Sequence, residues 1–307
     1  MSDNSKSYKR PKQQPQRRQP VSHLERLIAE TLAIEAETAE EAGAIGYMAR
    51  ALVQATLPHK ATTGTTFMRR NGNFSLVMMA RPDVGLPYGS IPRLLMAWMT
   101  TEAIRTKDPV LVLGPTLSGF LKQLGLLRSG GIRGDIRRLR DQMRRLFTCA
   151  VSCVYEDENN DEILNLQVVE EAKLWWAPKS SEQTVLWRST VTLGRRFFAE
   201  MTTNPVPIDF RVLKALTRSP LAIDIYTWLT YRVSYLKRRT AIPWEALQAQ
   251  FGASYPLTTQ GKRNFKREFL QQLRKVHAIY TQANLEVAED FLILIPSKPH
   301  VFRRRSQ

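Results

Sequence analysis

Apolar and polar positions follow a helical pattern near the C-terminal end of the chain. Apolar side chains recur there at intervals of three and four, at Phe265, Phe269, Leu273, Val276 and Tyr280. This spacing predicts a helix with one apolar face, and at about 100° per residue the basic side chains fall on the other face. Two β-like runs follow at 285–287 and 291–295. A basic helix followed by a hairpin is the last part of a winged helix, a relative of the helix-turn-helix that reads the major groove of DNA.

A similar pattern lies upstream. Another apolar stripe is formed by Ile136, Leu139, Met143, Leu146 and Phe147. Arginines occupy the opposite side of this predicted helix, and Asp135 is the expected N-cap. A hairpin-like stretch follows over residues 148–169, and Trp98-Met99-Thr100 corresponds to Trp228-Leu229-Thr230 further back. The repetition predicts two related units, each with a long apolar helix, a short helix, a basic helix and a hairpin.

These patterns divide the chain and predict an α+β fold with tandem winged-helix domains. The N-terminal residues are Lys, Arg, Gln, Pro and Ser, which cannot bury enough apolar surface to become ordered. A helical pattern runs from Leu24 to Leu57, and Asn71-Gly72 suits the turn of a hairpin. The expected segments are a disordered basic tail (1–20), a helical segment (21–60), a first winged-helix domain (61–178), a strand-containing connector (179–208), a second winged-helix domain (209–301) and a basic tail (302–307).

Composition restricts the partners. The formal net charge of +17 and the pI of about 10.2 indicate a polyanionic partner, either nucleic acid or an anionic membrane. No apolar run approaches the roughly 18 residues of a membrane span, and the polar N-terminus has no secretory signal, so a cytoplasmic protein is expected. Cys149 and Cys153 have no nearby cysteine or histidine pair, so neither a metal nor a cofactor is expected.

The predicted DNA-contacting residues lie on the polar faces of the two basic helices. Arginine can read guanine with two hydrogen bonds, and glutamine can read adenine. The candidates are Lys262, Arg263, Lys266, Arg267, Gln271 and Arg274 on the second helix, and Arg133, Arg137, Arg140 and Arg144 on the first. An ordinary solvated basic face is the alternative interpretation. Both hairpin tips are acidic, so neither is expected to clamp phosphate.

Several short motifs occur in the same order as in a known family: Leu86-Pro87-Tyr88-Gly89-Ser90, Thr101-Glu102-Ala103-Ile104, Gln142-Met143-Arg144-Arg145, Asp224-Ile225-Tyr226-Thr227-Trp228 and Leu294-Ile295-Pro296-Ser297. On these motifs, residues 60–301 resemble the RepA family of plasmid replication initiators. The resemblance implies a bacterial tandem winged-helix protein that binds duplex repeats (iterons) in a plasmid origin and melts nearby A·T-rich DNA. It also implies recruitment of the host DnaA and DnaB proteins, and a homodimer, in equilibrium with the monomer, that represses its own gene through the first domain.

Enzymatic classes are disfavoured by the sequence. A nicking initiator needs a His-x-His metal site, and the four histidines are scattered at His23, His59, His277 and His300. A P-loop needs Ser or Thr after Gly-Lys, but Gly261-Lys262 is followed by Arg263. A non-enzymatic protein is therefore predicted. Two alternatives stay open: a winged-helix transcriptional repressor without a replication role, and a basic protein that binds RNA or an anionic membrane.

Overall fold

The computed structural model describes residues 23–127, 129, 134–176, 189–203, 205–252 and 254–302. These residues form ten helices and twelve strands, and every strand pair is antiparallel. The predicted α+β class is confirmed. Apart from Phe302, the two predicted tails lie outside the described residues. Residues 21 and 22, which precede α1, also lie outside them.

The two predicted repeats contain matching series of elements. The first repeat consists of α3 (Ser90–Thr106), β4 (Val110–Val112), α4 (Leu117–Gln123), α5 (Asp135–Phe147), β5 (Ala150–Glu156), β6 (Asp161–Gln167), β7 (Val169–Lys173) and β8 (Thr190–Leu193). The second repeat consists of α8 (Pro220–Tyr235), β10 (Thr240–Pro243), α9 (Trp244–Phe251), α10 (Thr259–Ile279), β11 (Leu285–Val287) and β12 (Phe291–Leu294). Both basic helices, α5 and α10, form where the apolar spacing predicted them.

Each repeat builds a three-stranded sheet of the same order. In the second repeat the order is β10-β12-β11, and in the first it is β4-β8-β7. The strand after the long helix thus pairs with the last strand, which pairs with a strand that follows the basic helix. This order makes β7 and β8 the counterparts of β11 and β12. Strand β8 lies in the predicted connector, yet it completes a sheet of the first repeat. Residues 179–188 of that connector lie outside the described residues.

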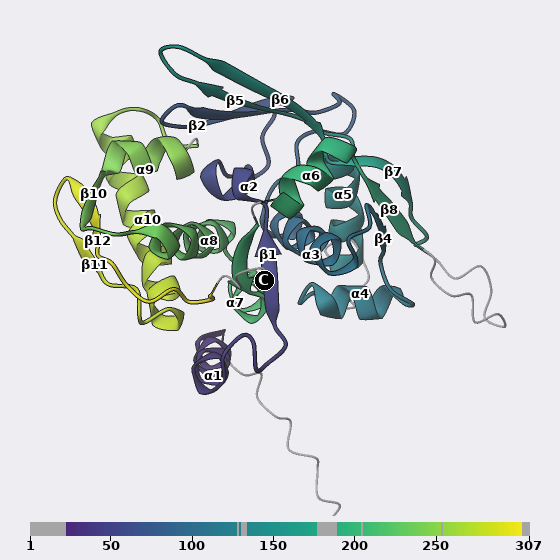
Figure 1. The fold of residues 1–307 in the computed structure, drawn as a ribbon, viewed down its shortest axis with the longest axis horizontal. Helices are drawn as coiled ribbons and strands as arrows, with labels where there is room; N and C mark the ends of the chain where they lie inside the picture. Colours follow the sequence, from purple (N-terminus) through teal and green to yellow (C-terminus); the bar gives the residue numbers. More distant parts are fainter. Residues whose placement is uncertain are drawn as a thin grey trace, which may run out of the picture.

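The predicted first hairpin forms, but as an addition to the shared pattern. Strands β5 and β6 pair around a turn at 157–160, as the sequence predicted. They belong to another sheet, β2-β3-β5-β6, with β2 (Thr66–Asn71) and β3 (Phe74–Met79). Gly72 between β2 and β3 has φ of +59°, as an Asn-Gly turn requires. Figure 1 shows this sheet along the upper edge of the molecule, with β2 near α9 of the second repeat.

The helical pattern predicted from Leu24 to Leu57 forms helix over only part of that range, and the strand within it was not predicted. The chain instead forms α1 (His23–Ala36), β1 (Ile45–Met48) and α2 (Arg50–Gln54). Strand β1 pairs with β9 (Val206–Asp209), which a local helical pattern cannot reveal. The pairing brings the backbone close to Phe210, since a Cβ on Gly46 would lie 2.7 Å from that ring. The remaining helices are α6 (Arg195–Thr203) and α7 (Phe210–Ala215).

The two long helices form the centre of the molecule. Most side chains of α3 and of α8 are buried, including Trp98 and Trp228 at corresponding positions. Figure 1 shows α3 and α8 near the middle, with the second repeat on the left and the first on the right. Buried apolar residues of both repeats belong to one continuous core. The basic helices α5 and α10 are therefore attached to a common body.

Candidate nucleic-acid interface

Helix α10 is anchored along its apolar side. It begins after Thr258, whose side chain accepts a hydrogen bond from the backbone N–H of Gly261 at 3.1 Å. Its buried Phe269 makes edge-on ring contacts with Trp228 of α8 and with Trp244 and Phe251 of α9, at centroid distances of 6.5, 5.9 and 5.5 Å. The predicted apolar stripe thus packs on the other two helices of the repeat and leaves the basic face outside.

The outer face of α10 presents four exposed polar side chains: Arg263, Arg267, Gln271 and Arg274. Together with Lys266 and Leu270 they line a shallow hollow along the helix. Within the part of the chain that the structure describes, no acidic residue pairs with these arginines. Arg267 donates to Asn264 Oδ1 at 3.1 Å, one helical turn away. Apart from this bond, no hydrogen bond or ion pair engages the side chains of Arg263, Arg267 and Arg274 among the described residues, so most of their donors can meet an anionic or base-edge partner.

The two predicted lysines of α10 are already engaged. Lys262 forms an ion pair with Glu245 at the start of α9. Lys266 is half-buried, and its Nζ donates to the backbone carbonyls of Ala288 at 3.2 Å and Glu289 at 2.6 Å. The same Nζ lies 4.9 Å from the ring centroid of Trp244. Lys266 therefore ties the basic helix to the turn between β11 and β12.

Helix α5 also presents arginines, with one correction to its start. Its N-cap is Gly134 rather than the predicted Asp135, whose carboxylate accepts from the Leu127 backbone N–H at 2.9 Å and so is not free to cap the helix. Arg137 and Arg140 are exposed and have no acidic partner among the described residues. The other two predicted DNA-contacting arginines differ from Arg137 and Arg140. Arg144 has an acidic neighbour, since its guanidinium lies 3.6 Å from the Asp83 carboxylate. Arg133 lies outside the described residues.

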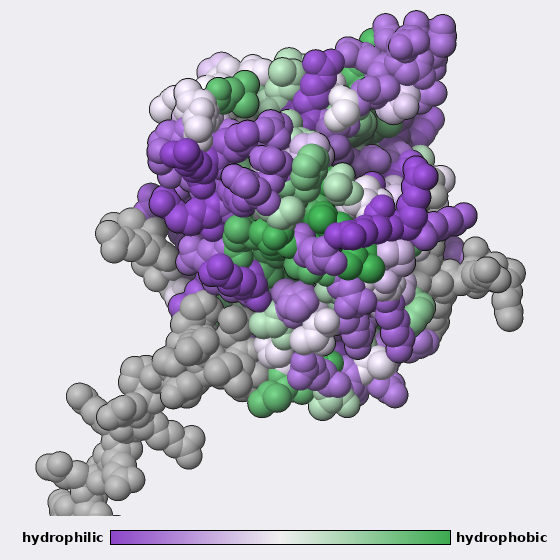
Figure 2. All heavy atoms as spheres, turned by 90° about the vertical axis from the view of Figure 1, so that its left-hand side faces the viewer, coloured by the Kyte–Doolittle hydropathy of each residue, from purple (hydrophilic) through white to green (hydrophobic). Residues whose placement is uncertain are grey.

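The structure does not bring the two basic faces together into one cluster. Figure 1 places α5 beside α3 on the right and α10 beside α8 on the left. Figure 2 shows the side that carries the second repeat, where a hydrophobic patch is surrounded by hydrophilic side chains. On the strands of that repeat, Val287 and Phe291 are exposed by 51% and 40%. This side is thus not uniformly hydrophilic.

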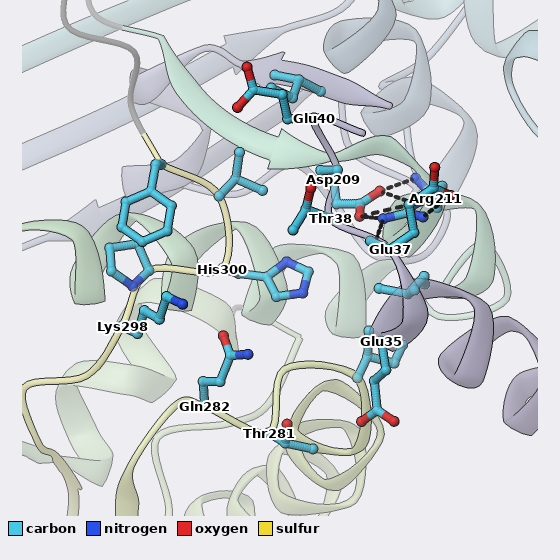
Figure 3. A pocket seen from close by; sticks show the side chains of 17 residues that line it. Glu35, Glu37, Thr38, Glu40, Asp209, Arg211, Thr281, Gln282, Lys298 and His300 are labelled. Carbon is cyan, nitrogen blue, oxygen red and sulfur yellow. Dashed lines mark hydrogen bonds and ion pairs between the residues drawn. The ribbon is translucent and has the colours of Figure 1, made fainter. Parts of the chain in front are cut away.

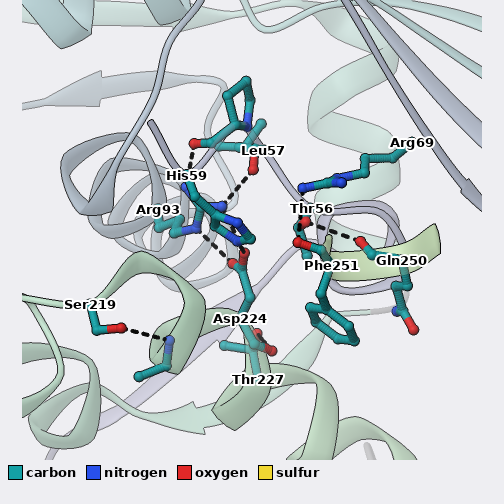
Figure 4. A network of polar contacts seen from close by, with 12 residues as sticks. Thr56, Leu57, His59, Arg69, Arg93, Ser219, Asp224, Thr227, Gln250 and Phe251 are labelled. Carbon is teal, nitrogen blue, oxygen red and sulfur yellow. Dashed lines mark hydrogen bonds and ion pairs between the residues drawn. The ribbon is translucent and has the colours of Figure 1, made fainter. Parts of the chain in front are cut away.

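A buried ionic network joins the repeats (Figure 4). Arg93 of α3 donates from Nε and Nη2 to the two carboxylate oxygens of Asp224 of α8, both at 2.7 Å. His59 Nε2 lies 2.7 Å from Asp224 Oδ2, and Arg93 also donates to the backbone carbonyl of Leu57 at 2.6 Å. Burial by itself would raise the pKa of Asp224, but the charge of Arg93 and the hydrogen bonds from His59 and Arg93 lower it.

The sequence patterns did not predict this network. Arg93 and Asp224 have side-chain exposures of 2% and 7% and lie inside the apolar stripes of α3 and α8. A single charge at a core position of each helix was the available signal, because a charge is rarely buried without a partner. The distance between them along the chain hid the pairing.

A second hollow lies between the α1–β1 segment, β9, α7 and the C-terminal residues 298–302 (Figure 3). Several charged side chains that line this hollow already form ion pairs or hydrogen bonds with one another. Asp209 accepts from Arg211 Nη2 at 2.7 Å and from the Arg211 backbone N–H at 2.8 Å. His300 Nδ1 lies 2.9 Å from the Tyr226 hydroxyl. Among the described residues, no group of three or more His, Cys, Asp or Glu is placed to hold a metal ion.

The described helices include none that is both long and apolar enough to cross a membrane. Cys149 and Cys153 are buried free thiols in the first repeat, and burial raises the pKa of each to about 12. Both therefore remain protonated core residues at neutral pH, and neither offers a reactive thiolate.

The fold is similar to that of two crystal structures of domains 2 and 3 of RctB. They match with TM-scores of 0.50 and 0.52, cover 80% and 82% of this chain and 96% of each matched chain, and are 14% identical to it. At this identity the similarity concerns the fold alone. A probable fimbrial chaperone, YfcS of Escherichia coli (strain K12), is 26% identical over 212 residues, which are 65% of this chain and 81% of that protein. That level of identity does not establish a family.

A model of the family described as "Plasmid encoded RepA protein" matches residues 86–246, a little over half of the chain. The matched region runs from just before α3 to the first turn of α9 and leaves α10 outside. It contains α5 and both members of the Arg93–Asp224 pair. The chain belongs to this family of plasmid-encoded RepA replication initiators.

Proposed function

We propose that this protein initiates plasmid replication by binding repeated duplex sequences (iterons) in the plasmid origin through α10. The observation that carries the proposal is the exposed row of Arg263, Arg267, Gln271 and Arg274 on a helix whose other side is anchored in the core. Arginine and glutamine are the side chains best suited to read guanine and adenine edges in the major groove. A net charge of +17 adds the sequence-independent attraction to phosphate.

The proposed architecture is a tandem winged helix. Each repeat has a long helix, a strand, a short helix, a basic helix and two further strands, with sheet orders β4-β8-β7 and β10-β12-β11 supporting the correspondence. In that arrangement α10 and α5 take the place of the helix that enters the groove. The first repeat then extends to β8, beyond the boundary at 178 that the sequence suggested.

The remaining parts of the proposal come from family membership. We expect a cytoplasmic, non-enzymatic protein that opens the origin and recruits the host DnaA and DnaB proteins. A homodimer formed through the first repeat would repress the protein's own gene, in equilibrium with a monomer that initiates. A repressor without a replication role would instead bind an inverted repeat and fail to support plasmid replication, whereas an RNA or membrane binder would show no preference among duplex sequences.

Arg267→Ala should weaken binding to the origin repeat by about 1–3 kcal/mol and relax the preference at one base position. The reason is the loss of a bidentate contact to one base edge. The measurement is fluorescence anisotropy with the protein's own origin repeat and with a scrambled duplex of equal length. The matched control is Arg105→Ala, which removes the same charge from the exposed last turn of α3.

Equal losses on the specific and scrambled duplexes would show that Arg267 contacts only phosphate. An unchanged affinity, or an equal loss in Arg105→Ala, would remove α10 from the interface. A complementary in vivo assay is transformation with an origin plasmid supplied with each variant, since an initiator variant that cannot bind its repeats yields no plasmid-bearing colonies.

The double variant Arg137→Ala with Arg140→Ala tests whether α5 binds DNA alongside α10. Both side chains are exposed on α5, and a second basic helix on a common body would reach a neighbouring groove face about 10–10.5 base pairs away. We expect the hydroxyl-radical footprint of the monomer to shorten by about one helical turn while protection by α10 persists. A footprint of unchanged length would leave α5 as a solvated surface helix.

A further inference from the structure

An aromatic pocket lies between α8, α9 and the α2–β2 region, and no part of the duplex-binding face of α10 lines it. Three rings from the C-terminal half of α8 line a hollow of about 200 Å³: Tyr231, Tyr235 and the buried Trp228, which also packs on Phe251 and Phe269. Gln250 of α9, Gln54 of α2 and Asn71 of β2 also line it. This volume accommodates a single planar heterocycle, and the amide side chains supply polar atoms at its rim.

The side-chain amides of the aromatic pocket use their nitrogens, but not their oxygens, in hydrogen bonds with the described residues. Gln250 Nε2 donates to the backbone carbonyl of Gln54 at 3.0 Å, and Asn71 Nδ2 donates to the same carbonyl at 3.0 Å. The side-chain oxygens of Gln250 and Asn71 accept no hydrogen bond from the described residues. The pocket therefore offers two fixed acceptors for the N–H groups of a ligand.

Arg232 adds a donor without a partner. Its Nη1 donates to the Tyr235 hydroxyl at 2.6 Å, while its Nε is buried and has no hydrogen-bond partner in the described structure. A buried N–H without a partner is unfavourable. The same guanidinium lies over the ring of Tyr235, 5.3 Å from its centroid, and so holds that ring in place at the pocket. Amide acceptors thus stand beside the rings of Tyr231 and Tyr235, which pack edge to face at 4.9 Å. Acceptors beside aromatic rings suit a nucleobase.

Basic residues follow the aromatic pocket in the sequence. Directly after Tyr235 the loop to β10 carries Lys237 and Arg238, both exposed and without an acidic partner among the described residues. The next residue, Arg239, differs because it pairs with Glu286 of β11. Proteins that bind single strands place aromatic side chains under the bases and cations along the phosphates, as this stretch does.

We infer that the aromatic pocket binds one base of single-stranded DNA, with Lys237 and Arg238 at the adjoining phosphates. The identification of the strand as DNA rests on the proposed function, because opening an origin exposes such a strand; the site itself rests on the residues of α8 and its neighbours. The same chemistry could come from a free nucleotide, so the test includes one.

The experiment compares single-stranded and duplex binding in the full chain. A fluorescein-labelled, non-self-complementary 20-nucleotide strand and the duplex origin repeat are titrated by anisotropy. Tyr235→Ala should weaken single-strand binding by about tenfold, as expected for the loss of one base–aromatic stack, and leave duplex affinity unchanged. Tyr235→Phe keeps the ring and should keep single-strand affinity. Tyr235 is 46% exposed, so a thermal melt of each variant should match that of the native chain.

Arg267→Ala provides the opposite control, with weaker duplex binding and unchanged single-strand binding. If Arg267→Ala leaves duplex affinity intact while Tyr235→Ala still weakens single-strand binding, the proposed α10 interface fails and the pocket assignment stands. Equal losses on strand and duplex, or no loss on the strand, in Tyr235→Ala would overturn the pocket assignment. Competition by thymidine monophosphate at the same concentration as the strand would overturn it as well, because the pocket would then be a free-nucleotide site.

Discussion

Replacing Asp224 with alanine should lower the free energy of unfolding by about 3–5 kcal/mol, the range for removing one partner of a buried ion pair. The guanidinium of Arg93 would lose both of its carboxylate contacts and remain buried beside backbone carbonyls. His59 would lose its hydrogen-bond partner at the same time. Urea unfolding at pH 7, followed by circular dichroism and tryptophan fluorescence, measures the change, with the m-value checked for two-state behaviour.

Two controls separate the buried network from charge in general. Asp83→Ala removes an exposed carboxylate that pairs with Arg81 and Arg144, and should change stability little because water screens exposed pairs. The double variant Arg93→Met with Asp224→Leu removes both buried charges and should recover much of the loss. If Asp224→Ala is no more destabilising than Asp83→Ala, the ionic network does not hold α3 against α8.

Elements with short-range signals were predicted well from the sequence. The apolar stripe of α10 is continuous over several turns, and each of its members packs inward. The β2–β3 hairpin was marked by Asn71-Gly72, because few other residue pairs accept the positive φ that its turn needs. In both cases the information lies within one element, so the local pattern is sufficient.

Long-range pairing was not predictable in the same way. The segment Ile45–Met48 has an apolar pattern that also suits a helix, and only its pairing with β9 makes it a strand. Strand β8 was assigned to a connector, although it lies between β4 and β7 in a sheet. Choosing a strand's partner depends on the arrangement of distant elements, which periodicity in one sequence does not specify.

In the candidate interface too, local side-chain directions were predictable from the sequence, whereas contacts with distant elements were not. A helical wheel gives the direction of each side chain around α10, and it correctly placed Arg263, Arg267, Gln271 and Arg274 away from the core. It could not reveal that the β11–β12 turn reaches Lys266, because that contact comes from another element. Residues whose partners lie on the same helix are therefore predicted more safely than those at its margins.

Acidification should destabilise the protein between pH 7 and pH 5 because of two histidines. Burial lowers the pKa of His59, although its hydrogen bond to Asp224 acts in the opposite direction, and burial likewise lowers the pKa of His300. In the unfolded chain both take up a proton as the pH falls below the ordinary value of 6.5, whereas in the folded chain the lowered pKa moves this protonation to more acidic pH. Protons therefore favour unfolding as the pH falls through 6.5, and the stability is regained as the pH rises.

The expected slope follows from the number of protons. Each histidine contributes at most about 1.4 kcal/mol per pH unit, so the pair contributes up to about 2.7 kcal/mol per pH unit below 6.5. His59→Gln and His300→Gln each keep a polar side chain toward Asp224 or Tyr226 but do not titrate, and each should flatten the dependence by up to one proton. Urea unfolding at pH 5, 6 and 7 measures the slope. Asp224 does not affect this window, since its lowered pKa places its own titration at more acidic pH. A slope that is identical in the native chain and both variants would show that these histidines accept protons equally in the folded and unfolded states.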